Sequence, residues 1–326
     1  MNSKKKIKYC YEFFFIFLIT IQNSKAQDMT PRIGLLFQTW AYNDTTLEAK
    51  SNFRIRRAEI KLNGKTSSEL RYFLSIDPSK NLKEGVIEKT NDNKILQDVG
   101  IEYSFNSEWK VTIGQFKAPN TVESFTSTAE LLLPERAIQS RNFGNNRQIG
   151  ALFTFENTKI KIRSMISNGG RANTIDENSS KDLHGRVDFN PIENLSLGAF
   201  GTYADSKQST TYWNGLNFKA SWRSITLATE GIFGKESNTT FKGFYTDLFY
   251  DYKKIICPVL RFEYLDNHEF ISKVYNAGIS YNLLESKAKL QLSYAHLENA
   301  SSDLGSPKAA KGSQGSLVTA NFQLSF

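Results

Sequence analysis

Residues 315–326 read GSLVTANFQLSF, and this stretch decides the fold. Apolar residues occupy every second position from 318 to 326, and the positions between them hold Thr319, Asn321, Gln323 and Ser325. Because successive side chains of a β-strand point to opposite faces, the segment predicts a strand with one apolar and one polar face. It ends on an aromatic residue, Phe326.

The same two-residue period recurs along the chain. A soluble β-sandwich would also alternate, with its apolar face in a core. In a transmembrane barrel the apolar face meets lipid and the polar face, inside, can be filled with charge. Lys159, Lys161 and Arg163 alternate with isoleucines, which favours an all-β transmembrane antiparallel β-barrel. We expect sixteen strands, at 32–42, 52–63, 68–77, 96–105, 108–117, 147–156, 158–167, 182–189, 194–204, 210–220, 223–234, 241–252, 255–265, 270–282, 286–298 and 315–326.

The connections between these segments differ at the two ends. Those after even-numbered segments are short, whereas those after odd-numbered segments include the long stretches 78–95, 118–146, 168–181 and 299–314. A sandwich gives no reason for this asymmetry. Short periplasmic turns and longer outer loops give one. We therefore expect one barrel domain over 27–326, with 299–314 as a mobile outer loop.

The N-terminus has the pattern of an export signal. Four lysines precede the apolar run FFFIFLITI at 13–21, and Ser24 and Ala26 supply the small residues of a cleavage site. Nine residues are too few for a spanning helix, which needs about 20. Removing the signal peptide 1–26 takes away five lysines and one glutamate, leaving 36 basic and 32 acidic residues, a net charge of +4. The charge therefore gives no support for nucleic-acid binding.

Motifs typical of disulfides, metal sites or catalytic sites are absent from the sequence. Cys10 lies in the signal and Cys257 is alone in the rest of the chain, so no disulfide or Cys-x-x-Cys metal site is expected. No HExxH, P-loop or GxSxG pattern occurs. Among the three histidines, His268 lies near Asp266 and Glu269, which we interpret as an accidental polar loop. We expect no enzyme activity, no cofactor and no metal.

Three segments carry a family resemblance. They are FRIRRAEIKLNGK at 53–65, WKVTIGQFKAP at 109–119 and LPERAIQSRNFGNNRQIG at 133–150. In this order they resemble the phosphate-selective porin O and P family of Gram-negative outer membranes. The resemblance implies a sixteen-stranded barrel, usually a homotrimer, that conducts small anions. The chain is short for the family, and the resemblance supports the family better than phosphate as the solute.

An arginine cluster falls on the second strand. Strict alternation would place Arg54 and Arg56 inside and Arg57 in lipid, whereas Ala58, Ile60 and Leu62 would form the apolar face. An arginine at the lipid midplane costs about 2–4 kcal/mol. We therefore predict a β-bulge between Arg56 and Arg57 that keeps all three arginines in water. With Arg71 on the adjacent strand, they are expected to form one basic surface.

Basic lumen residues are the candidate ion path, because arginine and lysine attract anions and arginine donates hydrogen bonds in pairs. For each single residue, the alternative is a salt bridge that braces the wall. The candidate set is Arg54, Arg56, Arg57, Arg71, Lys110, Lys117, Arg136, Arg141, Arg147, Lys161, Arg163 and Arg186.

The 118–146 segment is the longest connection, and its place after the fifth strand matches the constriction loop of general porins. Its apolar run, Leu131 to Leu133, needs burial, which favours packing inside the barrel. The alternative is an extracellular loop at a subunit contact. The function expected is passive diffusion of small hydrophilic solutes with modest anion preference. The alternative is a structural or adhesive barrel in outer-membrane lipid without an open channel.

Overall fold

The structure is a computed structural model that describes residues 30–46, 51–81, 95–144, 146–170, 172–174, 179–205, 210–284, 287–303 and 306–326. The expected signal peptide, 1–26, lies outside the described residues and stays a prediction. No helix among the described residues is long and apolar enough to cross a membrane.

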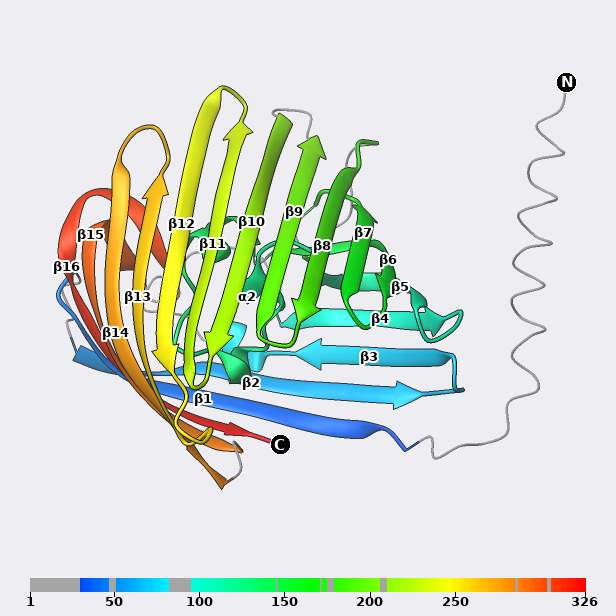
Figure 1. Ribbon diagram of the computed structural model, residues 1–326, viewed down its shortest axis with the longest axis horizontal. Coiled ribbons are helices and arrows are strands. Elements are labelled where there is room, and N and C mark those ends of the chain that lie inside the picture. Colours follow the sequence, from blue (N-terminus) through cyan, green and yellow to red (C-terminus); the bar gives the residue numbers. More distant parts are fainter. Residues whose placement is uncertain are drawn as a thin grey trace, which may run out of the picture.

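Sixteen antiparallel strands form one closed barrel, in which each strand pairs with its sequence neighbours and β1 pairs with β16 (Figure 1). This confirms the expected fold and strand number. The strands are β1 Arg32–Asp44, β2 Ser51–Lys65, β3 Leu70–Ile76, β4 Leu96–Ser104, β5 Trp109–Lys117, β6 Arg147–Glu156, β7 Ile160–Ser167, β8 Asp182–Ile192, β9 Leu195–Asp205, β10 Thr210–Trp222, β11 Ile225–Glu236, β12 Thr239–Tyr250, β13 Ile256–Asp266, β14 Ile271–Leu283, β15 Ala288–Asp303 and β16 Ser306–Ser325.

The two faces of each strand divide as the alternation predicts. Apolar side chains such as Ile113, Phe153 and Leu216 are exposed on the outer wall, where 51–64% of their surface is accessible. The polar residues Asn321 and Gln323 are almost fully buried in the interior. The fold is therefore inverted relative to a soluble sandwich, with lipid as the solvent of the apolar face.

The C-terminal strand closes the barrel. Its register places Phe322 opposite Thr39 and Ser325 opposite Leu36. Leu35 N donates to Phe326 O at 2.7 Å and Phe326 N donates to Leu35 O at 3.1 Å. Inside this seam, Gln38 donates to Gln323 at 2.6 Å. Closure leaves no unpaired strand edge in the membrane.

The two ends of the barrel differ in their connections. After even-numbered strands the links are two to five residues long, whereas three of the links after odd-numbered strands, at 77–95, 118–146 and 168–181, are far longer. The prediction of a mobile loop at 299–314 is wrong, because β15 reaches Asp303 and β16 begins at Ser306. Ala300 opposite Ala309 and Ser302 opposite Pro307 continue the ladder, so small and polar residues here extend a hairpin.

The predicted bulge lies at Arg56. Gln38 of β1 pairs with Arg57, but the next residue, Thr39, pairs with Ile55, so Arg56 is the extra residue of β2. Arg56 and Arg57 are consecutive and both buried inside, while Ile55 is exposed outside. The bulge changes the phase of the strand and keeps every arginine of the cluster off the lipid face.

Candidate functional site

The connection 118–146 folds into the barrel. It carries α2 Val122–Phe125, the 3-10 turn η3 Thr128–Glu130 and the π-helical turn η4 Ser140–Gly144. Figure 1 shows α2 inside the ring of strands, next to β10 in this view. Ser280 of β14 donates to Leu132 O at 2.7 Å, and Lys289 of β15 donates to Ala129 O at 2.6 Å. Leu131 and Leu133 are buried, as the apolar run requires.

Buried carboxylates hold the same segment, which we call the inner loop. Glu230 of β11 accepts from Val122 N at 2.5 Å, and Glu263 of β13 accepts from Ile138 N at 2.6 Å. Arg261 joins Glu123 of the inner loop at 2.5 Å to Asp247 of β12 at 2.6 Å. An unpaired charge in such a site would cost several kcal/mol, about 3–5. The inner loop is thus fixed against strands β11–β15.

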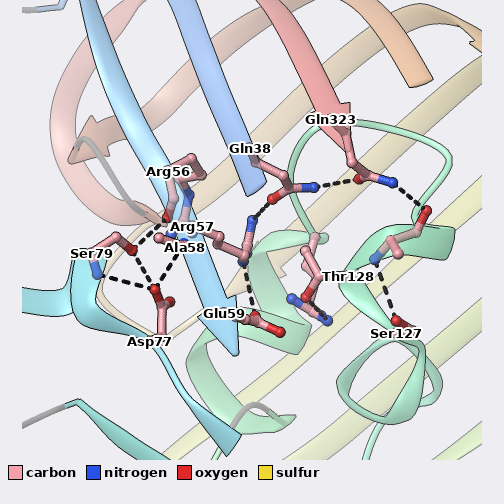
Figure 2. Close-up of polar contacts among 12 residues, drawn as sticks. Gln38, Arg56, Arg57, Ala58, Glu59, Asp77, Ser79, Ser127, Thr128 and Gln323 are labelled. Carbon is pink, nitrogen blue, oxygen red and sulfur yellow. Dashed lines mark hydrogen bonds and ion pairs between the residues drawn. The ribbon is translucent and has the colours of Figure 1, made fainter. Parts of the chain in front are cut away.

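The arginine cluster of β2 reaches the inner loop from the other side. Arg56 forms an ion pair with Glu135 at 2.6 Å, and Arg57 lies 3.7 Å from the same carboxylate. Burial alone would raise the pKa of Glu135, but Arg56 and Arg57 hold it well below the usual range of a carboxyl group. Arg57 also donates to Gln38 at 2.6 Å, and Figure 2 shows the chain of contacts from β2 through β1 to Gln323.

The expectation of one basic surface shared by this cluster and Arg71 is wrong. In the β2–β3 ladder Arg71 lies opposite Lys65. Lys65 is eight positions along the strand from Arg57, or roughly 26 Å at about 3.3 Å per residue. Because β2 and β3 are antiparallel and joined by a short turn, the start of β3 lies opposite the end of β2. Arg71 therefore lies near that turn, far along β2 from the arginine cluster.

A cavity of about 490 Å³ lies on the remaining side of the lumen, along β2–β7 and next to the inner loop. It extends toward the end with the short turns, because its wall includes residues close to the start of β5 and β7. Seven basic side chains line it: Lys61, Arg71, Lys110, Lys117, Arg147, Lys161 and Arg163. Four carboxylates line it as well: Glu59, Asp98, Glu102 and Glu156. The charge of the lining is therefore +3.

Most bases of this cavity have an acidic partner. Arg147 contacts Asp98 through Nε at 2.8 Å and Nη2 at 3.1 Å. Further ion pairs within 4.0 Å join Lys61 to Glu59, Arg71 to Glu102, Lys161 to Glu156 and Arg163 to Asp188. Lys117 donates to Ser124 O at 2.6 Å. Within the described part of the chain, neither Lys110 nor Lys117 has a carboxylate partner in a salt bridge.

Four other predicted site residues contact the wall or the inner loop. Arg186 donates to both oxygens of Asp188 and to Asn120 O, which ties the wall to the start of the inner loop. Arg136 donates to Glu123 O at 2.7 Å and Thr126 O at 2.9 Å and so holds the inner loop together. Arg141 lies in η4, where Glu263 and Glu135 supply the main favourable charges around it. Arg54 lies 5.8 Å from the ring of Trp40.

Neither His268 nor His184 forms a catalytic arrangement that is open to solvent. Asp266 accepts from the backbone N of His268 at 2.9 Å, so this pair builds a turn. His184 contacts Ser167 at 3.1 Å and Thr202 at 3.0 Å, a link that the sequence did not indicate, but all three side chains are buried. Among the described residues no group of three His, Cys, Asp or Glu could hold a metal ion.

Sequence reasoning missed the partners that come from far along the chain. Glu135, which pairs with Arg56, and Lys61, which lines the cavity, are not among the predicted site residues. Pairing between Arg56 and Glu135 spans 79 residues, and Arg261 to Glu123 spans 138. No local pattern encodes such contacts. The Glu-Arg pair at 135–136 was the nearest available signal.

Comparison with known proteins gives a family and a fold. The family model described as phosphate-selective porin O and P matches residues 29–242. No curated protein matches the chain by sequence.

Among solved structures, the anion-selective porin from Comamonas acidovorans has a TM-score of 0.67 at 12% identity, over 92% of this chain and 100% of that one. The trimer form of OmpT from Vibrio cholerae has a TM-score of 0.67 at 7% identity, over 92% and 100%. The channel DcaP of Acinetobacter baumannii has a TM-score of 0.62 at 9% identity, over 93% and 99%. At these identities the likeness shows the fold.

Proposed function

Because this chain belongs to the phosphate-selective porin O and P family and is an outer-membrane porin of Gram-negative bacteria, we propose that it passes small hydrophilic solutes with a modest preference for anions. The solutes pass between the inner loop and strands β2–β7. Phosphate specificity is not part of the proposal.

The observation that carries the proposal is the charge of the cavity, in which seven bases face four carboxylates. Paired bases contribute little net field to a passing ion. Lys110, which has no salt bridge to a carboxylate among the described side chains, supplies the positive field, whereas Lys117 is held by Ser124 O of the inner loop at 2.6 Å. A charge in a narrow pore next to low-dielectric walls acts on a permeating ion more strongly than it does in bulk water.

The comparisons add support of a weaker kind. One structural relative is named as an anion-selective porin, and another was determined as a trimer. We propose that this chain is likewise a homotrimer, which would appear in a planar bilayer as conductance steps in groups of three. Family and fold are those of channels without catalysis.

The test is the reversal potential of the purified mature protein across a planar bilayer in a potassium chloride gradient. We expect anion preference, and replacing Lys110 by glutamine should lower the anion-to-cation permeability ratio about twofold near 0.15 M salt. The matched control replaces Lys253, an exposed lysine of the β12–β13 turn, by glutamine and should leave the ratio unchanged.

Two results would count against the proposal. A wild-type pore that prefers cations, or a Lys110→Gln variant with an unchanged ratio, would show that Lys110 does not set the selectivity. A correctly folded protein that carries no current would favour the rival, a structural or adhesive barrel.

A further inference from the structure

An apolar patch lies in the same cavity as the basic residues. Phe73 of β3, Phe116 of β5 and Leu152 of β6 come from the wall, and Phe125 comes from α2 of the inner loop. We call these four side chains the ring patch. Phe73 and Phe116 meet edge to face, with ring centroids 6.5 Å apart. Phe116 is buried in the wall and Phe73 and Leu152 pack against it, so the half-buried Phe73, Leu152 and Phe125 supply the apolar surface that faces the cavity.

The wall beneath the ring patch is made of glycines. Phe73 lies opposite Gly100 in the β3–β4 ladder, Gly100 lies opposite Gly114, and Gly114 lies opposite Gly150. Residues directly opposite one another share a face, so these glycines form one row across β4, β5 and β6. A Cβ on Gly100 would come within 2.8 Å of the Phe73 ring. The row therefore lets the rings lie against the wall and leaves the cavity open in front of them.

The fourth member faces the cavity from the inner loop. Phe125 is half-buried, and the guanidinium of Arg163 lies 4.8 Å from its ring centroid, which is the geometry of a cation–π contact. Lys117 donates to the neighbouring Ser124 O at 2.6 Å. An apolar surface and two positive groups thus meet at one point of the lumen, where the inner loop touches strands β5 and β7.

We propose that this cavity is a binding site for organic anions that carry an aromatic ring and a single phosphate or carboxylate head. The ring lies on the ring patch and the head lies beside Lys110 and Arg163, which the ladders place at one level of the wall, each opposite Thr154. The volume of about 490 Å³ is within the range of about 300–1,000 Å³ typical of small-molecule sites. The inference rests on the proposed anion path and names the class of solute for which that path is built.

Two phosphate monoesters separate the ring from the charge. At pH 8 methyl phosphate and phenyl phosphate are both dianions, since the second pKa of a phosphate monoester is about 6. Each is added to the wild-type pore in a planar bilayer, and the half-blocking concentration of the chloride current is measured. Because one aromatic contact in a binding site is worth a few-fold in affinity, we expect phenyl phosphate to block at about three- to tenfold lower concentration. This comparison needs no variant.

Variants then locate the effect. Phe125→Ala should remove most of the difference between the two esters and leave block by methyl phosphate nearly unchanged. Phe153→Ala is the matched control, because Phe153 lies on β6 but points to the lipid face with 51% of its surface exposed. Lys110→Gln should weaken block by both esters equally.

Equal half-blocking concentrations for the two esters in an anion-selective wild-type pore would overturn the inference and leave the proposed function standing. A full preference for phenyl phosphate in Phe125→Ala would also overturn it, because the ring would then bind elsewhere. Cation preference in potassium chloride alone would instead refute the proposed function, so the two failures are distinguishable.

Discussion

Replacing Glu135 by glutamine changes one charge in the lumen with almost no change in shape. Glu135 lies between Arg56 at 2.6 Å and Arg57 at 3.7 Å, and 16% of its side chain is exposed. Arg56 and Arg57 keep its pKa far below the usual carboxyl range, so the group is ionised at any pH used in bilayer work. The variant therefore removes one full negative charge and leaves two arginines with less compensation.

The expected change in selectivity follows from Coulomb's law. At a distance of one Debye length, about 8 Å near 0.15 M salt, a unit charge acts on a monovalent ion with about 0.5 kcal/mol in water, and with about 0.2 kcal/mol after screening. Loss of the negative charge stabilises an anion in the pore by about 0.2 kcal/mol and destabilises a cation by the same amount. The anion-to-cation permeability ratio should thus rise about twofold. The shift should vanish near 1 M salt, where the Debye length is about 3 Å.

The assay is the reversal potential in a potassium chloride gradient at both salt levels. Glutamine keeps an acceptor for Arg56, so the local cost is about 1–2 kcal/mol, the difference between a charged and a neutral hydrogen bond. The matched control is Glu69→Gln, which makes the same charge change at the exposed β2–β3 turn. A shift no larger than that of the control would show that ions do not pass the arginine cluster, and a shift toward cations would contradict the reasoning outright.

Two further predictions concern the architecture. Replacing residues 122–143 by a short Gly/Ser linker should raise single-channel conductance, because the inner loop occupies the lumen; an unchanged conductance in a folded variant would contradict this. Gly114→Ala should reduce the free energy of unfolding by about 1–3 kcal/mol, measured as a lower urea midpoint. The φ of Gly114 is +146°, and a Cβ at this position would collide with Val99 O. Gly185→Ala, where nothing lies within 4 Å, should leave the midpoint nearly unchanged.

Most of the fold could be predicted because a barrel is governed by a local rule. Alternation between lipid and lumen is visible in each strand, and pairing of sequence neighbours follows from the short turns. The bulge at Arg56 was predictable for the same reason, since the phase of apolar residues changes there. The hairpin at 299–314 was not, because small and polar residues such as Ser301 and Gly312 are as frequent in loops as in strand ends beyond the membrane.

The candidate site was less predictable. Alternation decides which charges point inward, but their roles depend on what faces them across the barrel. Arg56 and Arg186 had the same status in the sequence, yet one meets a carboxylate of the inner loop and the other meets Asp188 and a backbone oxygen. The patch of Phe73, Phe116 and Phe125 required the register of four strands and the placement of α2, neither of which a local pattern contains.

The route of the inner loop determines which charges are available to a solute. It leaves the wall at Lys117 and returns at Arg147, two residues that pair across β5 and β6. Its carboxylate and carbonyl contacts lie on the opposite wall, with Glu230, Glu263 and Lys289. A segment that starts on one wall and is fixed to the other must cross the lumen. The buried charges of β11–β13, which are Glu230, Asp247, Arg261 and Glu263, hold it there and each has a partner. The bases of β2–β7 that line the cavity still face open space, and among them those without a carboxylate partner contribute most to the field that a passing anion meets.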